Sequence, residues 1–238
     1  MRYFPRAVAT IAALLIAMTL GGKEGASSEG TACNANRPAT PELAIKALLE
    51  GTGRWASGKQ QHPGEDSERR DCLFKNAQTP FAAILSCADS RVPPNLVFDQ
   101  GLGDLFVVRV AGNSTDDLVV QSLGYAAEHL HAEVILVLGH QQCGAVKAAV
   151  DSYPQSAPYF LSVIYRAVAK AKDIIKRRGG DPNDKVAVAK EAIDQHVILE
   201  VQGLRRRAPF KQLVESGKLK IVGGRYDLDS GKVTMVIE

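Results

Sequence analysis

Three short apolar segments, 81–87, 104–110 and 133–140, constrain the fold most strongly. They read FAAILSC, DLFVVRV and EVILVLGH. Apolar runs of this length, rich in β-branched and aliphatic residues, are typical of parallel strands covered on both faces. Segment 116–130 lies between the second and third runs and begins with two acidic residues, as a crossover helix does. The pattern therefore predicts successive strand–helix–strand units.

The flanking segments complete an α/β prediction. Segment 40–59 begins with a threonine cap and a proline and has apolar residues near helical spacing, so it predicts an amphipathic helix or two short helices. Segments 158–180 and 184–207 are long amphipathic helix candidates, whereas the polar stretch 62–75 is expected to be a surface connection. The tail 218–238 reads as strand, turn and strand. The predicted fold is a central, mainly parallel β-sheet flanked by helices, with a C-terminal β-hairpin.

The first thirty residues differ from the rest of the chain. Arg2 and Arg6 precede an apolar stretch, and a small, polar segment follows, which is the order found in a secretory signal peptide. The apolar part is short for a transmembrane helix, although an uncleaved anchor remains an alternative. We expect residues 1–30 to be a signal peptide and polar leader, and 31–238 to be one exported catalytic domain with an N-terminal helical arm. The expected location is periplasmic or secreted, with no stable membrane insertion after cleavage.

Composition narrows the classes of partner. The net charge is +3 over 238 residues, and removal of the leader would take two arginines away. Aromatic residues make up 6% of the chain, and the basic clusters are expected to be solvated helix ends. The sequence therefore gives no support for nucleic-acid binding.

Two cysteines and one histidine are placed where a metal could bind. Cys87 and His140 stand at the carboxyl ends of the first and third predicted strands, and Cys143 follows closely. Ligand sites in open α/β sheets gather at that edge. Two thiolates and an imidazole suit zinc, and three protein ligands leave a fourth position for water. The alternative is that the four cysteines of an exported chain form two disulfides, with three possible pairings.

Two separated motifs, CADSR and GHQQCGAVKAA, resemble the CxDSR and HxxCG motifs of the β-class carbonic anhydrases. The resemblance covers nearly everything after residue 40. It implies reversible hydration of carbon dioxide to bicarbonate by a zinc-bound hydroxide, with one zinc ion held by Cys87, His140 and Cys143. Asp89 and Arg91 match the carboxylate–arginine dyad of the family. A homodimer or a higher homo-oligomer is also implied.

The substrate pocket is predicted from the same resemblance. Gln78, Phe106, Tyr125 and Gly144 match residues that line the pocket in the plant-like branch, some of them supplied across a dimer interface. Carbon dioxide is apolar and needs only a small dry pocket, for which Ala111 is a further plausible wall beside Phe106 and Tyr125.

Several positions refine or depart from the family pattern. Ile84 stands where bicarbonate-inhibited relatives have an aromatic residue, so we expect the open subtype. His196 occupies a position that is often asparagine, and it is expected to be an ordinary core or surface histidine. If Asp89 turned from Arg91 toward the metal, it would become an alternative fourth ligand in a closed state and activity would fall at low pH.

Two further hypotheses remain open from the sequence. Cys33 and Cys72 could form a disulfide between the N-terminal segment and the loop before the first strand. The rival functions are hydrolysis of carbon disulfide or carbonyl sulfide on the same site and a noncatalytic zinc-binding role. A thiol redox protein is disfavoured because the chain has no CxxC motif.

Overall fold

The structure is a computed structural model that describes residue 33 and residues 36–238. The predicted signal peptide lies outside the described residues. Within the described part of the chain, no helix is both long and apolar enough to cross a membrane.

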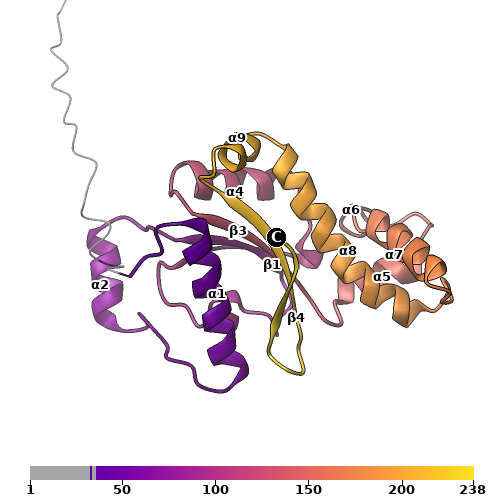
Figure 1. Ribbon diagram of the computed structural model, residues 1–238, viewed down its shortest axis with the longest axis horizontal. Helices are drawn as coiled ribbons and strands as arrows, with labels where there is room; N and C mark the ends of the chain where they lie inside the picture. The colour runs from indigo at the N-terminus through magenta and orange to yellow at the C-terminus, as the bar shows by residue number, and fades with distance from the viewer. Residues whose placement is uncertain (1–32, 34–35) are drawn as a thin grey trace, which may run out of the picture.

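A five-stranded sheet with the order β2-β1-β3-β4-β5 forms the centre of the molecule (Figure 1). β1 pairs in parallel with β2 and β3, and β3 pairs in parallel with β4. β4 and β5 form an antiparallel hairpin, so the predicted fold class is confirmed. The strands are β1 (Ala82–Cys87), β2 (Leu105–Val110), β3 (Val134–His140), β4 (Lys220–Tyr226) and β5 (Val233–Ile237).

Helices connect the strands and cover both faces of the sheet (Figure 1). The predicted crossover helix is α4, and the long helix predicted at 184–207 is α8. The helices are α1 (Pro41–Ala56), α2 (Ser67–Lys75), α3 (Pro94–Val97), the 3-10 helix η2 (Ala111–Asn113), α4 (Asp117–Glu128), α5 (Gly144–Ser152), α6 (Tyr159–Ser162), α7 (Tyr165–Arg177), α8 (Lys185–Arg206) and α9 (Phe210–Glu215).

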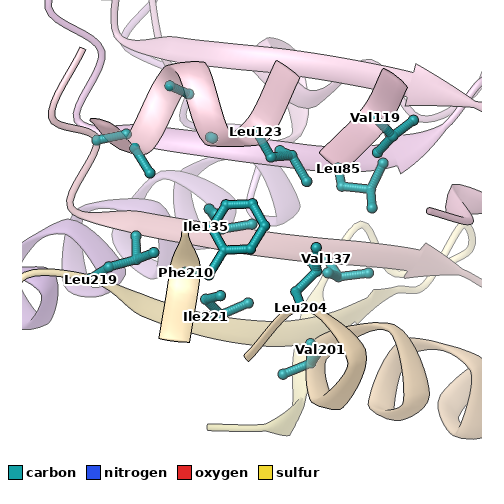
Figure 2. Packing of buried hydrophobic residues seen from close by; sticks show 14 of the residues in the cluster. Leu85, Val119, Leu123, Ile135, Val137, Val201, Leu204, Phe210, Leu219 and Ile221 are labelled. Atoms are coloured by element: carbon teal, nitrogen blue, oxygen red, sulfur yellow. The ribbon is translucent and has the colours of Figure 1, made fainter. Parts of the chain in front are cut away.

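One face of the sheet packs against α4, α8 and α9. Aliphatic side chains of β1, β3 and β4 meet those of the three helices in a continuous core, and the ring of Phe210 is fully buried among them. This packing fixes α8 along β3 and β4, which matters for the site described below. Figure 2 labels the contributors Leu85, Val119, Leu123, Ile135, Val137, Val201, Leu204, Phe210, Leu219 and Ile221.

The opposite face is covered by α1 and α3. Thr40 caps α1 as predicted, because its hydroxyl accepts a hydrogen bond from the backbone N–H of Leu43 at 3.3 Å. Leu48 of α1 is fully buried against this face. The indole of Trp55 donates a hydrogen bond of 2.9 Å to the hydroxyl of Tyr226 in β4. These contacts attach the N-terminal helix to the same sheet edge that carries the site.

Three local expectations were wrong. The polar stretch 62–75 contains α2, because Asp66 accepts a hydrogen bond from the N–H of Arg69 and caps a helix that buries no residue fully. The single helix expected at 158–180 is two helices, α6 and α7. β2 is only half-buried although its sequence is almost wholly apolar, because it lies at the edge of the sheet.

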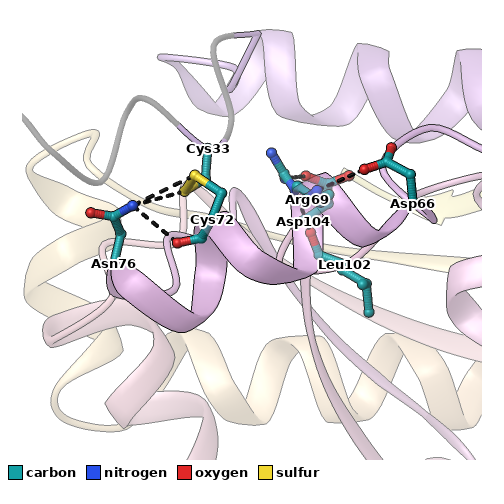
Figure 3. The surroundings of a disulfide bond; sticks show 7 residues. All are labelled: Cys33, Asp66, Arg69, Cys72, Asn76, Leu102 and Asp104. Carbon is teal, nitrogen blue, oxygen red and sulfur yellow. Dashed lines mark hydrogen bonds and ion pairs between the residues drawn. A yellow bond between two sulfur atoms is a disulfide. The ribbon is translucent and has the colours of Figure 1, made fainter.

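The disulfide hypothesis for Cys33 and Cys72 is confirmed (Figure 3). The bond reaches α2 rather than a loop, because Cys72 lies within that helix. The side-chain amide of Asn76 donates to the Cys72 carbonyl at 3.0 Å and to the Cys33 sulfur at 3.3 Å. About one turn earlier in α2, Arg69 forms an ion pair of 2.6 Å with Asp104. The helix is therefore held by a covalent link and an ion pair rather than by an apolar face.

Candidate metal centre

Three potential metal ligands converge at the carboxyl edge of the sheet. Cys87 ends β1 and His140 ends the neighbouring strand β3, so strand order brings their side chains together. Cys143 directly precedes α5 at its N-cap position. All three residues are buried, and their ligand atoms lie within 4.8 Å of one another. The Sγ atoms of Cys87 and Cys143 are 4.0 Å apart.

The tautomer of His140 leaves one of its ring nitrogens able to bind a metal. Its Nδ1 donates a hydrogen bond of 2.9 Å to the Gln141 carbonyl oxygen, which can only accept. The proton is therefore on Nδ1, and the lone pair is on Nε2. Nε2 is buried and has no hydrogen-bond partner among the described residues. Because buried polar atoms are ordinarily paired, and two sulfurs face this one, the donor set fits zinc.

The two thiols do not ionise independently. The hydrogen bond with Cys143 holds the pKa of the Cys87 thiol well below its ordinary value, against the opposing effect of burial, and His140 and the N–H of Gly112 add to the lowering. The same hydrogen bond with Cys87, together with burial, raises the pKa of the Cys143 thiol. A pair of this kind loses its second proton readily only when a cation occupies the site.

Asp89 and Arg91 form a closely paired dyad beside these ligands. The Oδ1 atom of Asp89 accepts from the Arg91 backbone N–H at 3.0 Å and from its Nε at 2.9 Å, and Oδ2 accepts from Nη2 at 2.7 Å. The pairing lowers the pKa of the Asp89 carboxyl far below its usual range. Oδ2 also lies 3.8 Å from Nε2 of His140. The carboxylate is therefore held by Arg91 and borders the ligand cluster.

Arg109 is a site residue that the sequence reasoning missed. It extends from β2, where its Nε donates to the Cys87 carbonyl at 3.1 Å and its Nη2 donates to the Asp89 carbonyl at 2.6 Å. The guanidinium thereby fixes the backbone of the turn that carries both the sulfur ligand and the carboxylate. The available signal was a single charged residue inside an otherwise apolar strand.

Gly112 is a second residue that the sequence reasoning missed. Its backbone N–H donates to Cys87 Sγ at 3.4 Å. It adopts a left-handed φ of 74°, which glycine accepts without steric cost. A Cβ atom at this position would lie 2.9 Å from Cδ1 of Ile164 and 3.2 Å from Cβ of Ala145. The left-handed φ and the tight contact with Ala145 together favour glycine where the loop reaches the sulfur.

The structure places the predicted pocket residues in different parts of the fold. The rings of Phe106 in β2 and Tyr125 in α4 have centroids 6.2 Å apart. Gln78 is exposed after α2, Ala111 is exposed in η2, and Gly144 is the first residue of α5. Their convergence into one pocket stays a prediction.

Cys143 also lines a cavity of about 830 Å³. It lies between α5, α8 and the turn of the C-terminal hairpin, and it is a different space from the predicted pocket.

The comparisons with known proteins agree with this geometry. The family model described as carbonic anhydrase matches residues 82–233, a span that includes the entire ligand cluster. Carbonic anhydrase 2 of Mycobacterium tuberculosis (strain H37Rv) is 38% identical over 199 residues, covering 82% of this chain and 92% of the relative. Beta carbonic anhydrase 3 of Arabidopsis thaliana is 30% identical, covering 77% of this chain and 76% of the relative. The chain belongs to the β-class carbonic anhydrase family.

The fold of this β-carbonic anhydrase is also that of solved relatives. The β-carbonic anhydrase of Coccomyxa, solved in complex with acetazolamide, superposes with a TM-score of 0.61 at 26% identity. The alignment covers 82% of this chain and 86% of that one. The family resemblance found in the motifs at 87–91 and 139–149 is therefore confirmed, together with the zinc dependence that goes with it.

Proposed function

We propose that this β-carbonic anhydrase catalyses the reversible hydration of carbon dioxide to bicarbonate and a proton. The observation that carries the proposal is the orphaned Nε2 of His140, which faces two thiols and lies 3.8 Å from the Asp89 carboxylate. A structural zinc site would need a fourth protein ligand, whereas the Cys–His–Cys cluster supplies three.

Cys87, His140 and Cys143 would hold the zinc ion, which when bound lowers the pKa of a water molecule so that it can act as a nucleophile near neutral pH. Two thiolates donate more charge than neutral imidazoles do, so neighbouring residues must contribute to catalysis. A bound cation also allows both thiols to stay deprotonated, which their close contact otherwise opposes.

Asp89 would orient the nucleophile. Its Oδ1 already accepts two hydrogen bonds from Arg91, whereas Oδ2 accepts one at 2.7 Å. Oδ2 therefore keeps a lone pair on the side nearest His140, where it can accept a hydrogen bond from the attacking water. Arg91 keeps the carboxylate ionised and holds it by three hydrogen bonds beside the ligand cluster. This arrangement agrees with the open subtype expected from Ile84.

Stopped-flow measurement of carbon dioxide hydration on the zinc-loaded protein tests the proposed activity. Cys143→Ser is the metal-site control, and Asp89→Asn tests the orienting carboxylate with nearly unchanged shape. We expect rapid hydration by the wild type and a decrease in both variants. Turnover of carbon disulfide or carbonyl sulfide without hydration would contradict the proposal, as would a full zinc complement without any turnover.

We also propose that the edge strand β2 is covered by a second copy of this chain. Apart from the exposed Arg109, its side chains are apolar and half-buried, and Leu102, Leu118 and Tyr125 in the neighbouring segments are exposed. A half-exposed apolar edge strand is a template for further pairing, which a symmetric dimer would cover. A solved structural neighbour from Sordaria macrospora is described as tetrameric, and it shares the fold at a TM-score of 0.61.

The homo-oligomer can be tested by light scattering coupled to gel filtration. Leu118→Glu places a charge on the exposed apolar surface of α4, next to β2, and Val186→Glu is a matched control because Val186 is also exposed but lies on α8. We expect the first variant to dissociate and the second to keep the wild-type mass. A monomeric wild type would contradict the proposal.

Export is the third proposal. The order of charge, apolar run and small residues in segment 1–30 supports it, as does the Cys33–Cys72 disulfide, because disulfides persist in oxidising compartments. Fractionation of cells that express the full chain, followed by N-terminal sequencing, tests this location. A full-length protein in the cytosolic fraction would contradict it.

A further inference from the structure

We propose that His196, on α8, is a positioning residue that holds the Gly112 amide against the zinc ligand Cys87. The inference rests on the proposed function only in taking Cys87 as a metal ligand. It concerns a residue that touches neither the sulfur nor the substrate, and it assigns a role to a histidine that the sequence alone predicts to be ordinary.

The first step is the contact between His196 and the loop after β2. The Nε2 atom lies 2.9 Å from the Gly112 carbonyl oxygen and 3.1 Å from Oγ of Ser114. Because a carbonyl oxygen only accepts, the proton must be on Nε2, which donates to it. The His196 side chain is 2% exposed, so the hydrogen bonds form out of contact with water. Burial lowers the pKa of this histidine, which favours the neutral ring.

Glu200, one turn later on α8, holds the same loop at a second point. Its Oε2 accepts from the backbone N–H of Thr115 at 3.1 Å and from the Thr115 hydroxyl at 2.6 Å. Its Oε1 lies 3.8 Å from Nδ1 of His196. The i and i+4 positions lie on one face of a helix, so both side chains approach residues 112–115 from the same side.

The second step is the link from the loop to the metal ligand. The Gly112 carbonyl accepts from His196, while the Gly112 N–H donates to Cys87 Sγ at 3.4 Å. Both groups belong to a residue with a left-handed φ of 74°. Without His196, the Gly112 carbonyl would keep only the longer hydrogen bond of 3.4 Å from the Ser114 hydroxyl, so the N–H that bonds the sulfur would be held less firmly.

An apolar side chain at position 196 would leave the buried Gly112 carbonyl without its donor at 2.9 Å. The buried imidazole instead pairs with a specific carbonyl next to a metal ligand. Groups that bond a metal ligand directly, as the Gly112 N–H bonds Cys87, typically change metal affinity or activity by about 10- to 100-fold when mutated, and His196 lies one contact further out. We therefore expect His196 to act on the electronic state of the sulfur and not only on fold stability.

The test uses the full chain loaded with cobalt(II) or zinc. His196→Leu removes the donor at similar volume, and His196→Gln keeps an N–H at comparable reach. Val201→Ala is the matched control, because Val201 is fully buried on the same helix but packs in the core against β3 and β4. Thr115→Val removes one loop contact and is the milder variant if His196→Leu does not fold.

The readouts are the thiolate-to-cobalt charge-transfer band and zinc affinity measured by chelator competition. We expect His196→Leu to shift the band to lower energy and to weaken zinc binding by about tenfold. His196→Gln should lie closer to the wild type, and Thr115→Val should show a smaller change in the same direction. Val201→Ala should lose thermal stability without changing the band.

A band and a zinc affinity that are the same in His196→Leu and Val201→Ala would overturn the positioning role. Failure of His196→Gln to restore either readout would also overturn it. Failure of the proposed function gives a different result. A wild-type protein that shows the charge-transfer band but does not hydrate carbon dioxide would refute the activity. The difference between the bands of His196→Leu and Val201→Ala would still decide the role of His196.

Discussion

Removal of the Cys33–Cys72 disulfide should destabilise the fold measurably. The bond joins cysteines 39 residues apart in sequence. Constraining a denatured chain by a loop of this length corresponds to about 4 kcal/mol in the chain-entropy model, and measured values for native disulfides are typically about 2–4 kcal/mol. Because α2 buries no residue fully, this constraint has few apolar contacts to replace it. In a chain of this size, 3 kcal/mol corresponds to a decrease in Tm of about 6–12 °C.

The assay compares urea denaturation of the zinc-loaded wild type with that of the double variant Cys33→Ala and Cys72→Ala. Wild-type protein reduced by a phosphine, which leaves the atoms of both residues in place, should show the same loss. Asn76→Ala is the control for the hydrogen bonds around the sulfurs, and it should lower the free energy of unfolding much less. An unchanged free energy of unfolding in both the reduced and the mutated protein would refute the reasoning, since it would mean that the segment does not unfold cooperatively with the sheet.

Three further predictions concern the metal site, the loop beside it and a buried ion pair between α1 and Asp99. Cys143→Ser should reduce bound zinc, measured by atomic emission, well below one ion per chain; a full complement would contradict the ligand assignment. Gly112→Ala should weaken zinc binding and lower the unfolding free energy by about 1–3 kcal/mol, because the new Cβ would meet Ile164 at 2.9 Å; wild-type values would contradict the packing argument. Arg54→Gln should lower the free energy of unfolding by about 3 kcal/mol, because it leaves the buried Asp99 without its ion pair. Burial raises the pKa of Asp99, but bonds from Arg54 and two backbone N–H groups outweigh it and lower the pKa. The ionised Asp99 therefore stabilises the fold fully above the ordinary carboxyl pKa, and this stabilisation is lost as the pH falls through the lowered pKa of Asp99. The variant lacks part of this stabilisation and should unfold at a higher pH than the wild type in an acid titration. An unchanged midpoint of acid unfolding would contradict this.

The sequence predicted the sheet well because apolar strands carry a strong signal. β1 and β3 are buried at every position, as their continuous apolar runs indicate. The metal ligands could be predicted for a related reason: parallel strands present their carboxyl ends at one edge, so Cys87 and His140 meet although they are far apart in the chain. The CADSR and HQQC motifs then specify the chemistry.

Other features depend on contacts between segments that are distant in sequence. α2 is polar and exposed, and it depends on a disulfide and on the Arg69–Asp104 ion pair, which join segments distant in sequence. β2 resembles a buried strand in sequence, and only its place in the strand order makes it an edge. The contact between His196 and the Gly112 carbonyl depends on how α8 crosses the sheet, which is set by packing of the whole domain.

The metal centre therefore depends on two levels of structure. Strand order brings Cys87 and His140 to one edge, and the turn between His140 and Cys143 brings the third ligand back, with Gln142 at a left-handed φ of 56°. These elements determine where the ligand atoms lie. The hydrogen bond from Gly112 is the proposed control on the charge of one sulfur, and the Gly112 carbonyl is held by a histidine 84 residues away on α8. Ligand motifs alone thus predict that zinc binds, whereas its reactivity also depends on contacts that only the folded domain creates.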